Sequence, residues 1–340
     1  MSRRTLSKVT ACAAAAALTL TACSEGMGGD GETGGILRFS LNQTEQHPSY
    51  IALDHFSDRL EDATGDRWSI DIYPNETLGA QAEALQLVSD GIIDMAVVSG
   101  AQLGNLNPGF TVYNLPQVFD DVAHQMDVVN DPSEVTKELF TSLEDSQNIT
   151  VLGGLTQGAR SVYTTFGPIE SPEDLAGMKM RVQESDLNTA MAQALGASAT
   201  PMAFGELYTG LQSGVVDAAE NNEVSYFTQK HYEVAPYFTY TNHLVGIDYV
   251  IINTDTLQKM SPEDRAAFRE GWRKTWQEHT QLWEEATQEA IEGAKAGGAT
   301  FTKIDTTPFD KRLQELLDEY IRTDLQQKLL DDARRQAARK

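Results

Sequence analysis

The stretch Met178–Asn222 reads MKMRVQESDLNTAMAQALGASATPMAFGELYTGLQSGVVDAAENN and decides the fold of the chain. Its first residues predict a short strand that carries Arg181, and a helix is expected over 204–212. Gly214 ends this helix, and the strand that follows leads into Asn221. Ligands of open α/β sheets bind at the C-terminal ends of the strands. We therefore expect Arg181 and Asn221 to lie in one site.

The same pattern occurs twice. Residues 83–94 (EALQLVSDGIID) match residues 206–217 (ELYTGLQSGVVD), and in each the Glu and the Asp are separated by the same spacing. Each match predicts a helix that ends at Gly91 or Gly214, followed by a strand of β-branched residues. The repeat predicts an α/β protein with two similar lobes. A chance match is the alternative, because such units are common in α/β proteins.

The N-terminus predicts an export signal. Three basic residues lie within the first eight, and 9–20 is apolar and rich in alanine. The apolar run is shorter than the ~20 residues that a membrane-spanning helix needs. Leu20-Thr21-Ala22-Cys23 resembles a bacterial lipobox, so residues 1–23 are expected to be a signal with lipid attached to Cys23. An uncleaved anchor and an ordinary cleaved signal are the alternatives.

Cysteine usage and length fit an exported protein of two domains. The chain has two cysteines, Cys12 and Cys23, so the mature domain is expected to hold no disulfide and no thiol nucleophile. Residues 24–35 are rich in glycine and predict a flexible tether. The remaining chain, about 305 residues, favours two domains over one.

The net charge of −24 excludes several classes of partner. Nucleic-acid binding needs a basic surface, and an acidic protein is also repelled by anionic lipid. An anionic solute would have to be captured by local cations inside a cleft.

The rest of the chain predicts alternating strands and helices. Strands are expected at 37–41, 68–73, 92–98, 149–155 and 237–252, and helices at 50–64, 79–90, 132–147, 262–294 and 308–336. The helix at 262–294 would span ~50 Å at 1.5 Å per residue. Its apolar face carries three tryptophans and lacks leucine heptads, which disfavours a coiled coil.

Four motifs resemble one family. They are Gly158-Ala-Arg160, Pro168-Ile169, the segment Asp174–Val182 with its Gly-x-Lys-x-Arg-Val ending, and the segment Gly196–Asn221. Together they resemble the extracytoplasmic solute-binding proteins of tripartite ATP-independent periplasmic (TRAP) transporters. The resemblance extends from about residue 37 to about residue 294.

The resemblance implies a two-lobe fold of the periplasmic-binding-protein type, with a hinge and a long helix that spans both lobes. The chain of such proteins crosses between the lobes more than once. We therefore expect 36–157 plus 246–286 to form lobe one, and 158–245 plus 287–340 to form lobe two.

The resemblance also implies which residues bind the ligand. Arg181 corresponds to the family's principal carboxylate-binding arginine, and a guanidinium matches a carboxylate with two parallel hydrogen bonds. Arg160 corresponds to a second arginine that faces the ligand. The alternative for Arg181 is a surface ion pair, and for Arg160 it is a structural pair with Glu170 or Asp174.

Five further residues of lobe two are candidates. Asn221 corresponds to the family's asparagine that hydrogen-bonds the ligand, and Glu220 is expected to fix the arginine or the loop. Phe204 would pack against the ligand or in the core. Tyr208 and Tyr226 would line the pocket or simply pack.

The candidates from lobe one follow expected strand ends. They are Gln43, Ser99 and Tyr113. Some family members carry an acid that contacts the ligand where this chain has Ser99-Gly100. This difference argues against a ligand with a positively charged group at that end.

No catalytic or metal-binding motif is found. The six histidines lack metal-ligand spacing, and neither G-x-S-x-G nor a Walker motif occurs. We expect no enzyme activity, no cofactor and no metal; a hydrolase with a carboxylate pair is the remote alternative.

Together with the lipobox at Cys23, the resemblance predicts a lipid-anchored, exported and monomeric protein that delivers a small organic acid to the membrane permease subunits of a TRAP transporter. Asn221-Asn222 without a following proline favours a sugar acid such as a uronate. A C4-dicarboxylate ligand, or a ligand sensor that docks on a receptor kinase, is the alternative.

Overall fold

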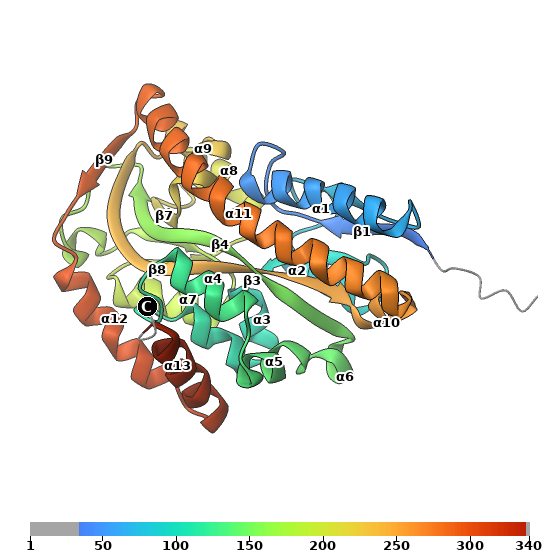
Figure 1. Cartoon of the computed structure of the whole chain (residues 1–340). Coiled ribbons are helices and arrows are strands. Elements are labelled where there is room, and N and C mark those ends of the chain that lie inside the picture. Colours follow the sequence, from blue (N-terminus) through green and yellow to red (C-terminus); the bar gives the residue numbers. More distant parts are fainter. Residues whose placement is uncertain (1–33, 338–340) are drawn as a thin grey trace, which may run out of the picture. The chain divides into compact units, whose positions relative to one another are not determined.

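Two long antiparallel strands, β4 (Ile149–Thr164) and β8 (Tyr237–Asn253), run through the middle of the fold (Figure 1). The computed structural model of the chain describes residues 34–337. The two strands pair from Ile149 opposite Asn253 to Thr164 opposite Tyr237. Their register shifts between Thr156 and Ala159 and again between Arg160 and Val162. Both strands therefore belong to both lobes, and they bulge where the lobes meet.

The remaining strands add to this pair in the order β2-β1-β3-β8-β4-β7-β5-β6, and β9 pairs with β8. They are β1 (Gly35–Ser40), β2 (Trp68–Tyr73), β3 (Met95–Ser99), β5 (Lys179–Val182), β6 (Ser198–Pro201), β7 (Ala218–Asn221) and β9 (Thr300–Lys303). β1 lies parallel to β2 and β3 in lobe one, and β5 lies parallel to β6 and β7 in lobe two. The expected α/β fold with two lobes is confirmed.

The repeated sequence unit forms the same structure in both lobes. In lobe one, α2 (Gln81–Ser89) is followed by Gly91 with φ 68°. In lobe two, α8 (Leu207–Ser213) is followed by Gly214 with φ 74°. Both glycines adopt the left-handed conformation that residues with a Cβ rarely take. Each helix then leads into a strand beside the first strand of its lobe. The β-branched pairs Ile92-Ile93 and Val215-Val216 lie before these strands, so both strands begin later than predicted.

The two aspartates of the repeat, Asp94 and Asp217, make matching contacts. The Oδ2 atom of Asp94 accepts a hydrogen bond of 2.9 Å from the backbone N–H of Arg38, in β1. The Oδ2 atom of Asp217 accepts one of 2.9 Å from the backbone N–H of Lys179, in β5. In each lobe the aspartate therefore fixes one strand against the turn that precedes its parallel neighbour.

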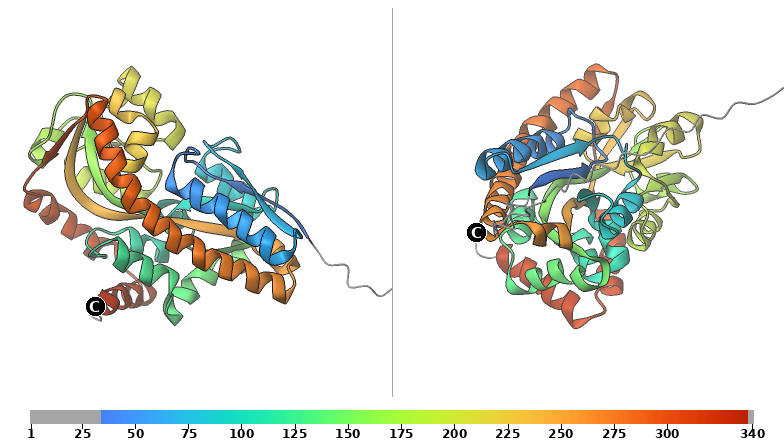
Figure 2. Two further views of the ribbon diagram at one scale, coloured as in Figure 1. Left: turned by 45° about the horizontal axis from the view of Figure 1, so that its top comes forward. Right: turned by 90° about the vertical axis from the view of Figure 1, so that its right-hand side faces the viewer.

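The long helix α11 (Pro262–Ala296) lies across both lobes, as the two views in Figure 2 show. It packs against α1 (Pro48–Thr64) of lobe one and α9 (Glu223–Thr228) of lobe two. Its N-terminus is capped by Ser261, and Pro262 occupies the first turn, where no N–H is needed. The expected helix that spans both lobes is confirmed.

Two helices predicted as single segments are divided in the structure. The segment 132–147 forms α5 (Glu134–Thr141) and α6 (Glu144–Gln147), and the segment 308–336 forms α12 (Thr307–Tyr320) and α13 (Asp324–Ala337). The second division occurs because Thr323 caps α13. Its Oγ1 atom accepts a hydrogen bond from Gln326 N, and Gln326 Oε1 accepts one from Thr323 N. This reciprocal pair starts a new helix.

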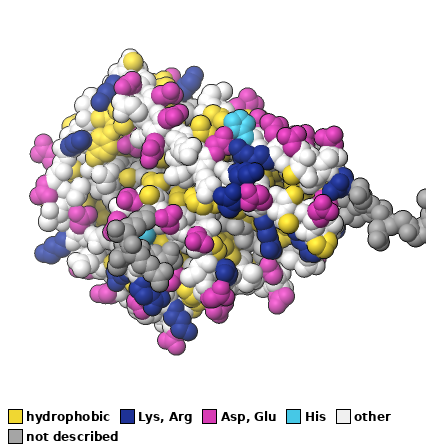
Figure 3. All heavy atoms as spheres, in the orientation of Figure 1, with side chains coloured by type: hydrophobic (Ala, Val, Ile, Leu, Met, Phe, Trp, Pro, Cys, Tyr) yellow, Lys and Arg dark blue, Asp and Glu magenta, His cyan; other side chains and the backbone are white. Residues whose placement is uncertain are grey.

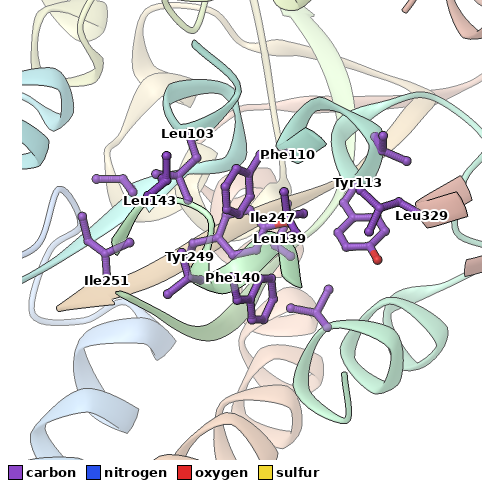
Figure 4. Close-up of a cluster of buried hydrophobic side chains, with 14 of the residues drawn as sticks. Leu103, Phe110, Tyr113, Leu139, Phe140, Leu143, Ile247, Tyr249, Ile251 and Leu329 are labelled. Carbon is purple, nitrogen blue, oxygen red and sulfur yellow. The ribbon is translucent and has the colours of Figure 1, made fainter. Parts of the chain in front are cut away.

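The C-terminal helix α13 packs against lobe one. Leu329 of this helix belongs to the hydrophobic cluster that contains Phe110 and Tyr113, and Figure 4 shows Leu329 beside Tyr113. Residues 324–337 were expected in lobe two, because they follow α12. The apolar face of α13 is instead buried by lobe one, and this contact assigns the helix to that lobe. The other lobe boundaries stay a prediction.

The remaining helices and turns cover the faces of the sheet. They are α3 (Gly100–Leu106), η1 (Pro108–Asn114), α4 (Val122–Asn130), η2 (Pro172–Leu175), α7 (Asp186–Ala194), η3 (Phe204–Glu206), η4 (His231–Glu233) and α10 (Thr254–Lys259). Separate hydrophobic clusters form on the faces of each lobe. Thr33–Lys340 forms one compact unit, so this segment is expected to fold without the residues before it.

Acidic side chains are spread over the face shown in Figure 3, with basic ones between them. Within residues 34–337, no helix combines the length and the apolar character that a bilayer crossing requires. In the same part of the chain, no group of three or more His, Cys, Asp or Glu side chains could hold a metal ion.

Gly158, at the register shift of β4 between Thr156 and Ala159, should tolerate no side chain. Its φ is +63°, and an added Cβ would lie 2.7 Å from Nε1 of Trp283 in α11. Gly177→Ala is the matched control, because Gly177 has φ +81° and no atom within 4 Å of the added Cβ. The left-handed conformation alone should cost each variant ~1–2 kcal/mol. Urea denaturation should show a larger loss for Gly158→Ala, because Trp283 must also move; equal losses would contradict this reasoning.

Candidate ligand-binding site

A pocket lies where the C-terminal ends of strands from both lobes meet. Its empty space is about 510 Å³ when the solvent in its open mouth is included. The lining residues are Asn42, Gln43, His47, Glu76, Gln81, Gln102, Gln157, Arg160, Arg181, Gln183, Glu184, Met202, Ala203, Phe204, Asn221, Asn222, Ser225, Asp248 and Trp283. Eight of these nineteen carry side-chain amides, so the wall is polar and mostly uncharged.

Arg181 offers the pocket an unpaired guanidinium. It lies in β5 opposite Thr200 and Ala219, and only 2% of it is exposed. Its Nε atom donates to the carbonyl oxygen of Met202 at 3.0 Å, whereas Nη1 is buried without a hydrogen-bond partner. Within residues 34–337, no acid forms an ion pair with Arg181. Burial lowers the pKa of this guanidinium, but an arginine stays protonated at neutral pH.

Aromatic side chains surround Arg181. Its Cζ atom lies 5.6 Å from the ring centroid of Phe204, a cation–π contact. Phe204 in turn meets His231 edge to face, and Nδ1 of His231 lies 2.9 Å from the hydroxyl oxygen of Tyr163. Burial first, and then the charge of Arg181, lower the pKa of His231 to about 3. His231 is therefore neutral and adds no second cation.

Arg160 is held by protein groups at all five of its N–H bonds. Nε donates to Glu220 Oε2 at 2.6 Å, and Nη2 donates to Glu220 Oε1 at 2.7 Å and to the Glu220 carbonyl oxygen at 2.9 Å. Nη1 donates to Gln157 Oε1 at 2.6 Å and to Asn221 Oδ1 at 2.9 Å. Because a guanidinium has five donors, Arg160 has none left for a ligand in this arrangement.

Glu220 balances the charge of Arg160 behind the pocket wall. Both side chains are buried, and Nε2 of His243 lies 3.3 Å from Glu220 Oε2. Burial acts to raise the pKa of Glu220, but the charge of Arg160 and the hydrogen bond from His243 outweigh it and hold the pKa at about 2. Glu220 is therefore an anion, and the Arg160–Glu220 pair adds little net charge.

Asn221 presents a donor to the pocket. Its Oδ1 atom accepts hydrogen bonds from Arg160 Nη1 and from the backbone and side-chain nitrogens of Asn222, at 2.9–3.0 Å. These bonds fix the orientation of the amide, so its NH₂ group is left to donate toward a ligand.

Lobe one contributes acceptors in the loops that follow β1 and β2. Asn42 Oδ1, Gln43 Oε1 and Glu76 Oε1 are all buried and have no hydrogen-bond partner within the described residues. Buried acceptors without partners carry a cost in free energy, and a ligand that donates hydrogen bonds removes it. Lobe one therefore offers the pocket unpartnered acceptors, whereas lobe two offers it the donors of Arg181 and Asn221.

Trp283 and His47 complete the pocket on the side of α11. Their rings meet edge to face at 5.6 Å, and Nε2 of His47 lies 3.4 Å from the hydroxyl oxygen of Ser225 in lobe two. His47 Nδ1 caps α1 by accepting from Ser49 N at 3.1 Å. Burial first, and then the nearby His279, lower the pKa of His47 to about 3, so this residue is neutral as well.

Comparison with known proteins gives the family. The model of the bacterial extracellular solute-binding proteins, family 7, matches residues 39–324. The chain belongs to this family. A solute-binding protein of Chromohalobacter salexigens is 33% identical over 279 residues, 81% of each chain. The 2,3-diketo-L-gulonate-binding periplasmic protein of Escherichia coli is 30% identical over 278 residues, 82% of this chain and 84% of that protein.

Solved structures agree with this family 7 assignment. A TRAP solute-binding protein of Anaerococcus prevotii with bound D-glucuronate is 37% identical with a TM-score of 0.86, over 89% of this chain and 98% of that one. One of Xanthobacter autotrophicus with bound β-D-galacturonate is 32% identical with a TM-score of 0.83, over 89% and 99%. The expected TRAP solute-binding function is confirmed, and such proteins serve transporters rather than catalysis.

The pocket of this family 7 protein brings together five of the eight residues predicted to contact the ligand. They are Arg181, Arg160, Asn221, Phe204 and Gln43. Their roles in binding stay predictions. Cys23, the predicted lipidation site, lies outside the described residues.

Three predicted contacts lie outside the pocket lining. Glu220 lies behind Arg160, as its expected structural role requires. Ser99 caps α3, and its N–H donates to Oε1 of the lining residue Gln81 at 3.0 Å. The hydroxyl group of Tyr208 donates to Glu233 on the outer side of α8. Neither Ser99 nor Tyr208 lines the pocket.

Two other tyrosines considered for the pocket belong to the core. The hydroxyl group of Tyr226 donates to the Ala235 carbonyl oxygen at 2.8 Å, and that of Tyr113 lies 2.8 Å from Thr136 Oγ1. Both rings are buried in hydrophobic clusters.

Many residues that line the pocket were not predicted from the sequence. Asn42 and Glu76 follow strands of lobe one, so the rule that found Gln43 could have found them. Trp283 was recognised only as part of an apolar helix face. Three acids, Glu76, Glu184 and Asp248, line the pocket although none follows β3.

Asp248 is the most perturbed acid of the pocket. Its Oδ1 atom accepts a hydrogen bond of 2.6 Å from Gln157 Nε2. Burial raises the pKa of Asp248 to about 6, although Gln157 and Arg160 act in the opposite direction. Asp248 therefore binds its proton more tightly in the folded protein than in the unfolded chain.

The stability of the protein should depend on pH through Asp248. Between pH 3.8 and about 6, Asp248 binds more protons in the folded state than in the unfolded state. Its contribution to the free energy of unfolding therefore falls as pH rises. Asp248→Asn keeps the acceptor for Gln157 and removes the titration. The free energy of unfolding of the variant should match that of the wild type near pH 4. Above pH 6.5 it should be higher by up to about 3 kcal/mol, because each pKa unit corresponds to 1.36 kcal/mol.

Urea denaturation at a series of pH values measures this difference. Asp145→Asn, at an exposed position of α6, is the control and should leave the pH profile unchanged. Parallel profiles for the wild type and Asp248→Asn would contradict the raised pKa.

Proposed function

We propose that this solute-binding protein captures a hexuronate, a sugar acid with one carboxylate and several hydroxyl groups, between its two lobes. The observation that carries the proposal is the buried guanidinium of Arg181, which has no acidic partner within the described residues. Solved relatives of similar fold hold D-glucuronate or β-D-galacturonate, which supports the same class of ligand here.

Arg181 would bind the carboxylate. Its Nε atom is occupied by Met202, so Nη1 and Nη2 are the atoms that can donate. The ring of Phe204 and the neutral His231 leave little water to compete for the guanidinium. A charge-assisted hydrogen bond in such surroundings is worth roughly 1.5–3 kcal/mol.

The side-chain amides would bind the hydroxyl groups. An amide can both donate and accept, and so can a hydroxyl group, so the two pair in either direction. The acceptors of Asn42 and Gln43 and the donor of Asn221 surround the space in front of Arg181. A ligand with hydroxyl groups on several sides of a ring satisfies this distribution better than a chain of methylene groups.

The charges of the pocket favour a monocarboxylate over a C4-dicarboxylate. Arg160 is neutralised by Glu220 and has no free donor, so Arg181 is the one free cation among the lining residues. A second carboxylate of the ligand would have no cationic partner. It would also approach Glu76, Glu184 or Asp248, which repel it.

We also propose that the loaded protein delivers its ligand to the permease subunits of a TRAP transporter, and that it acts as a monomer anchored by lipid on Cys23. The support for the anchor is the sequence Leu20-Thr21-Ala22-Cys23. Cells that express the full chain should incorporate radiolabelled fatty acid into the protein, and Cys23→Ser should abolish the label. Equal labelling of both would exclude Cys23 as the site.

Arg181 should decide whether acids bind. In a thermal-shift screen of residues 33–340, a hexuronate at 100 times its dissociation constant should add ~2.7 kcal/mol of stability. Arg181→Ala should abolish the shift, and Arg181→Lys should weaken binding because the second parallel hydrogen bond is lost.

Arg273→Ala, at an exposed position of α11, is the control and should keep the full shift. A shift that survives in Arg181→Ala would remove Arg181 as the carboxylate ligand. Stabilisation by neutral sugars but by no acid would overturn the proposed ligand class.

A further inference from the structure

The side chain of Glu76, which lines the pocket, bridges the two lobes. It belongs to the loop after β2 in lobe one, and its Oε2 atom accepts a hydrogen bond of 2.9 Å from the backbone N–H of Gly205 in lobe two. Its other oxygen, Oε1, is buried without a partner and belongs to the pocket wall. One carboxylate therefore has one oxygen engaged in contact between the lobes and one oxygen left for a ligand.

The backbone that presents Glu76 is unusual. Asn75 and Glu76 both have φ 56°, in the left-handed region. Asparagine adopts this conformation more readily than most residues, whereas glutamate does so rarely. Unfavourable backbone conformations persist where surrounding contacts impose them, and they often occur at functional sites. The turn therefore directs a long acidic side chain into the cleft.

The same turn is fixed to the loop that carries the other acceptors of lobe one. The N–H of Asn75 donates to the Gln43 carbonyl oxygen, and the N–H of Glu76 donates to the Leu41 carbonyl oxygen, each at 3.1 Å. Asn42 and Gln43 lie in this second loop. The three unpartnered oxygens that lobe one contributes to the pocket lining, those of Asn42, Gln43 and Glu76, are thus held in one rigid arrangement.

Close approach at Gly205 fixes the position of the carboxylate. A Cβ atom on Gly205 would lie 2.6 Å from Glu76 Oε2, so a side chain there would displace the carboxylate from the amide. Burial raises the pKa of Glu76, although the Gly205 amide and the charge of Arg181 lower it. The pKa of Glu76 is raised overall, as expected for a carboxylate with few hydrogen-bond donors around it.

We propose that Glu76 determines the specificity of the pocket for hydroxylated acids: Oε1 accepts a hydrogen bond from a ligand hydroxyl group, while Oε2 holds lobe two through Gly205. This inference rests on the proposed function and deepens it. A ligand bound by its carboxylate to Arg181 places its far end toward lobe one, where a hydroxyl donor pairs with Glu76 and a second carboxylate is repelled. Recognition of the hydroxyl group and closure of the lobes then depend on the same side chain.

A cycle between protein and ligand variants tests the hydroxyl contact. Calorimetry would measure the affinity of residues 33–340 for D-glucuronate and for its monodeoxy analogues, with the wild type and Glu76→Ala. For one hydroxyl position, the wild type should prefer the intact sugar acid by 10-fold or more, as expected for a hydrogen bond to a charged group. Glu76→Ala should bind D-glucuronate at least 10-fold more weakly and should distinguish the two ligands by less than about 2-fold.

Two further variants control this measurement. Glu76→Gln keeps the shape but has one acceptor oxygen, so it should lie between the wild type and Glu76→Ala. Glu45→Gln removes the same charge at an exposed position of lobe one and should leave every affinity within about 2-fold. The hydroxyl contact is overturned if Glu76→Ala prefers D-glucuronate over every deoxy analogue as strongly as the wild type does. It is also overturned if Glu76→Ala binds all acids more tightly than the wild type.

A distance measurement without ligand tests the contact between lobes. The chain beyond Cys23 has no cysteine, so spin labels can be placed at Asp62→Cys in α1 and Gln212→Cys in α8. Glu76→Ala should shift the distances toward longer values, and Glu45→Gln should not; identical distributions would overturn this part. If the wild type binds no uronate, the proposed function fails, and this measurement still decides whether Glu76 joins the lobes.

Discussion

The pairing of β4 with β8 is the constraint on which the rest of the structure depends. Because these two strands continue through both lobes, each lobe is built on a different half of the same hydrogen-bonded ladder. The register shifts near Gly158 and Arg160, where the ladder passes from one lobe to the other. Gln157, Arg160 and Asp248 all project into the pocket from this region, so the site and the junction of the lobes are formed by the same residues.

The Arg160–Glu220 pair determines how much charge the pocket offers to a ligand. A buried ion pair contributes little to stability by itself, because desolvation of both charges offsets their attraction. Its effect here is on selectivity. Glu220 takes three of the five donors of Arg160, and Gln157 and Asn221 take the other two. The pocket is left with one available cation, and the amide of Asn221 is oriented to donate.

The sequence predicts the repeated units and the long helix well, because local rules decide them. Gly91 and Gly214 end helices for steric reasons, and the tryptophan face of α11 follows helical periodicity. The position of α13 could not be predicted, since burial of Leu329 depends on a surface made by distant segments. The position of Glu76 after a strand of lobe one could have been found from the sequence, but its contact between the lobes could not, because Gly205 is 129 residues away in the sequence. Arg181 was found through motif spacing, whereas its lack of an acidic partner is a property of the folded chain.

The division of donors and acceptors between the lobes predicts that binding and closure are linked. Lobe two presents the guanidinium of Arg181 and the amide of Asn221, whereas lobe one presents the oxygens of Asn42, Gln43 and Glu76. Each set can be hydrated while it faces water, and closure removes that water. A ligand with a carboxylate at one end and hydroxyl donors at the other restores partners to both sets at once. A ligand with only one of these features leaves the buried polar groups of one lobe without hydrogen-bond partners. The binding free energy then loses the missing contact and also pays the desolvation penalty of those unpaired groups.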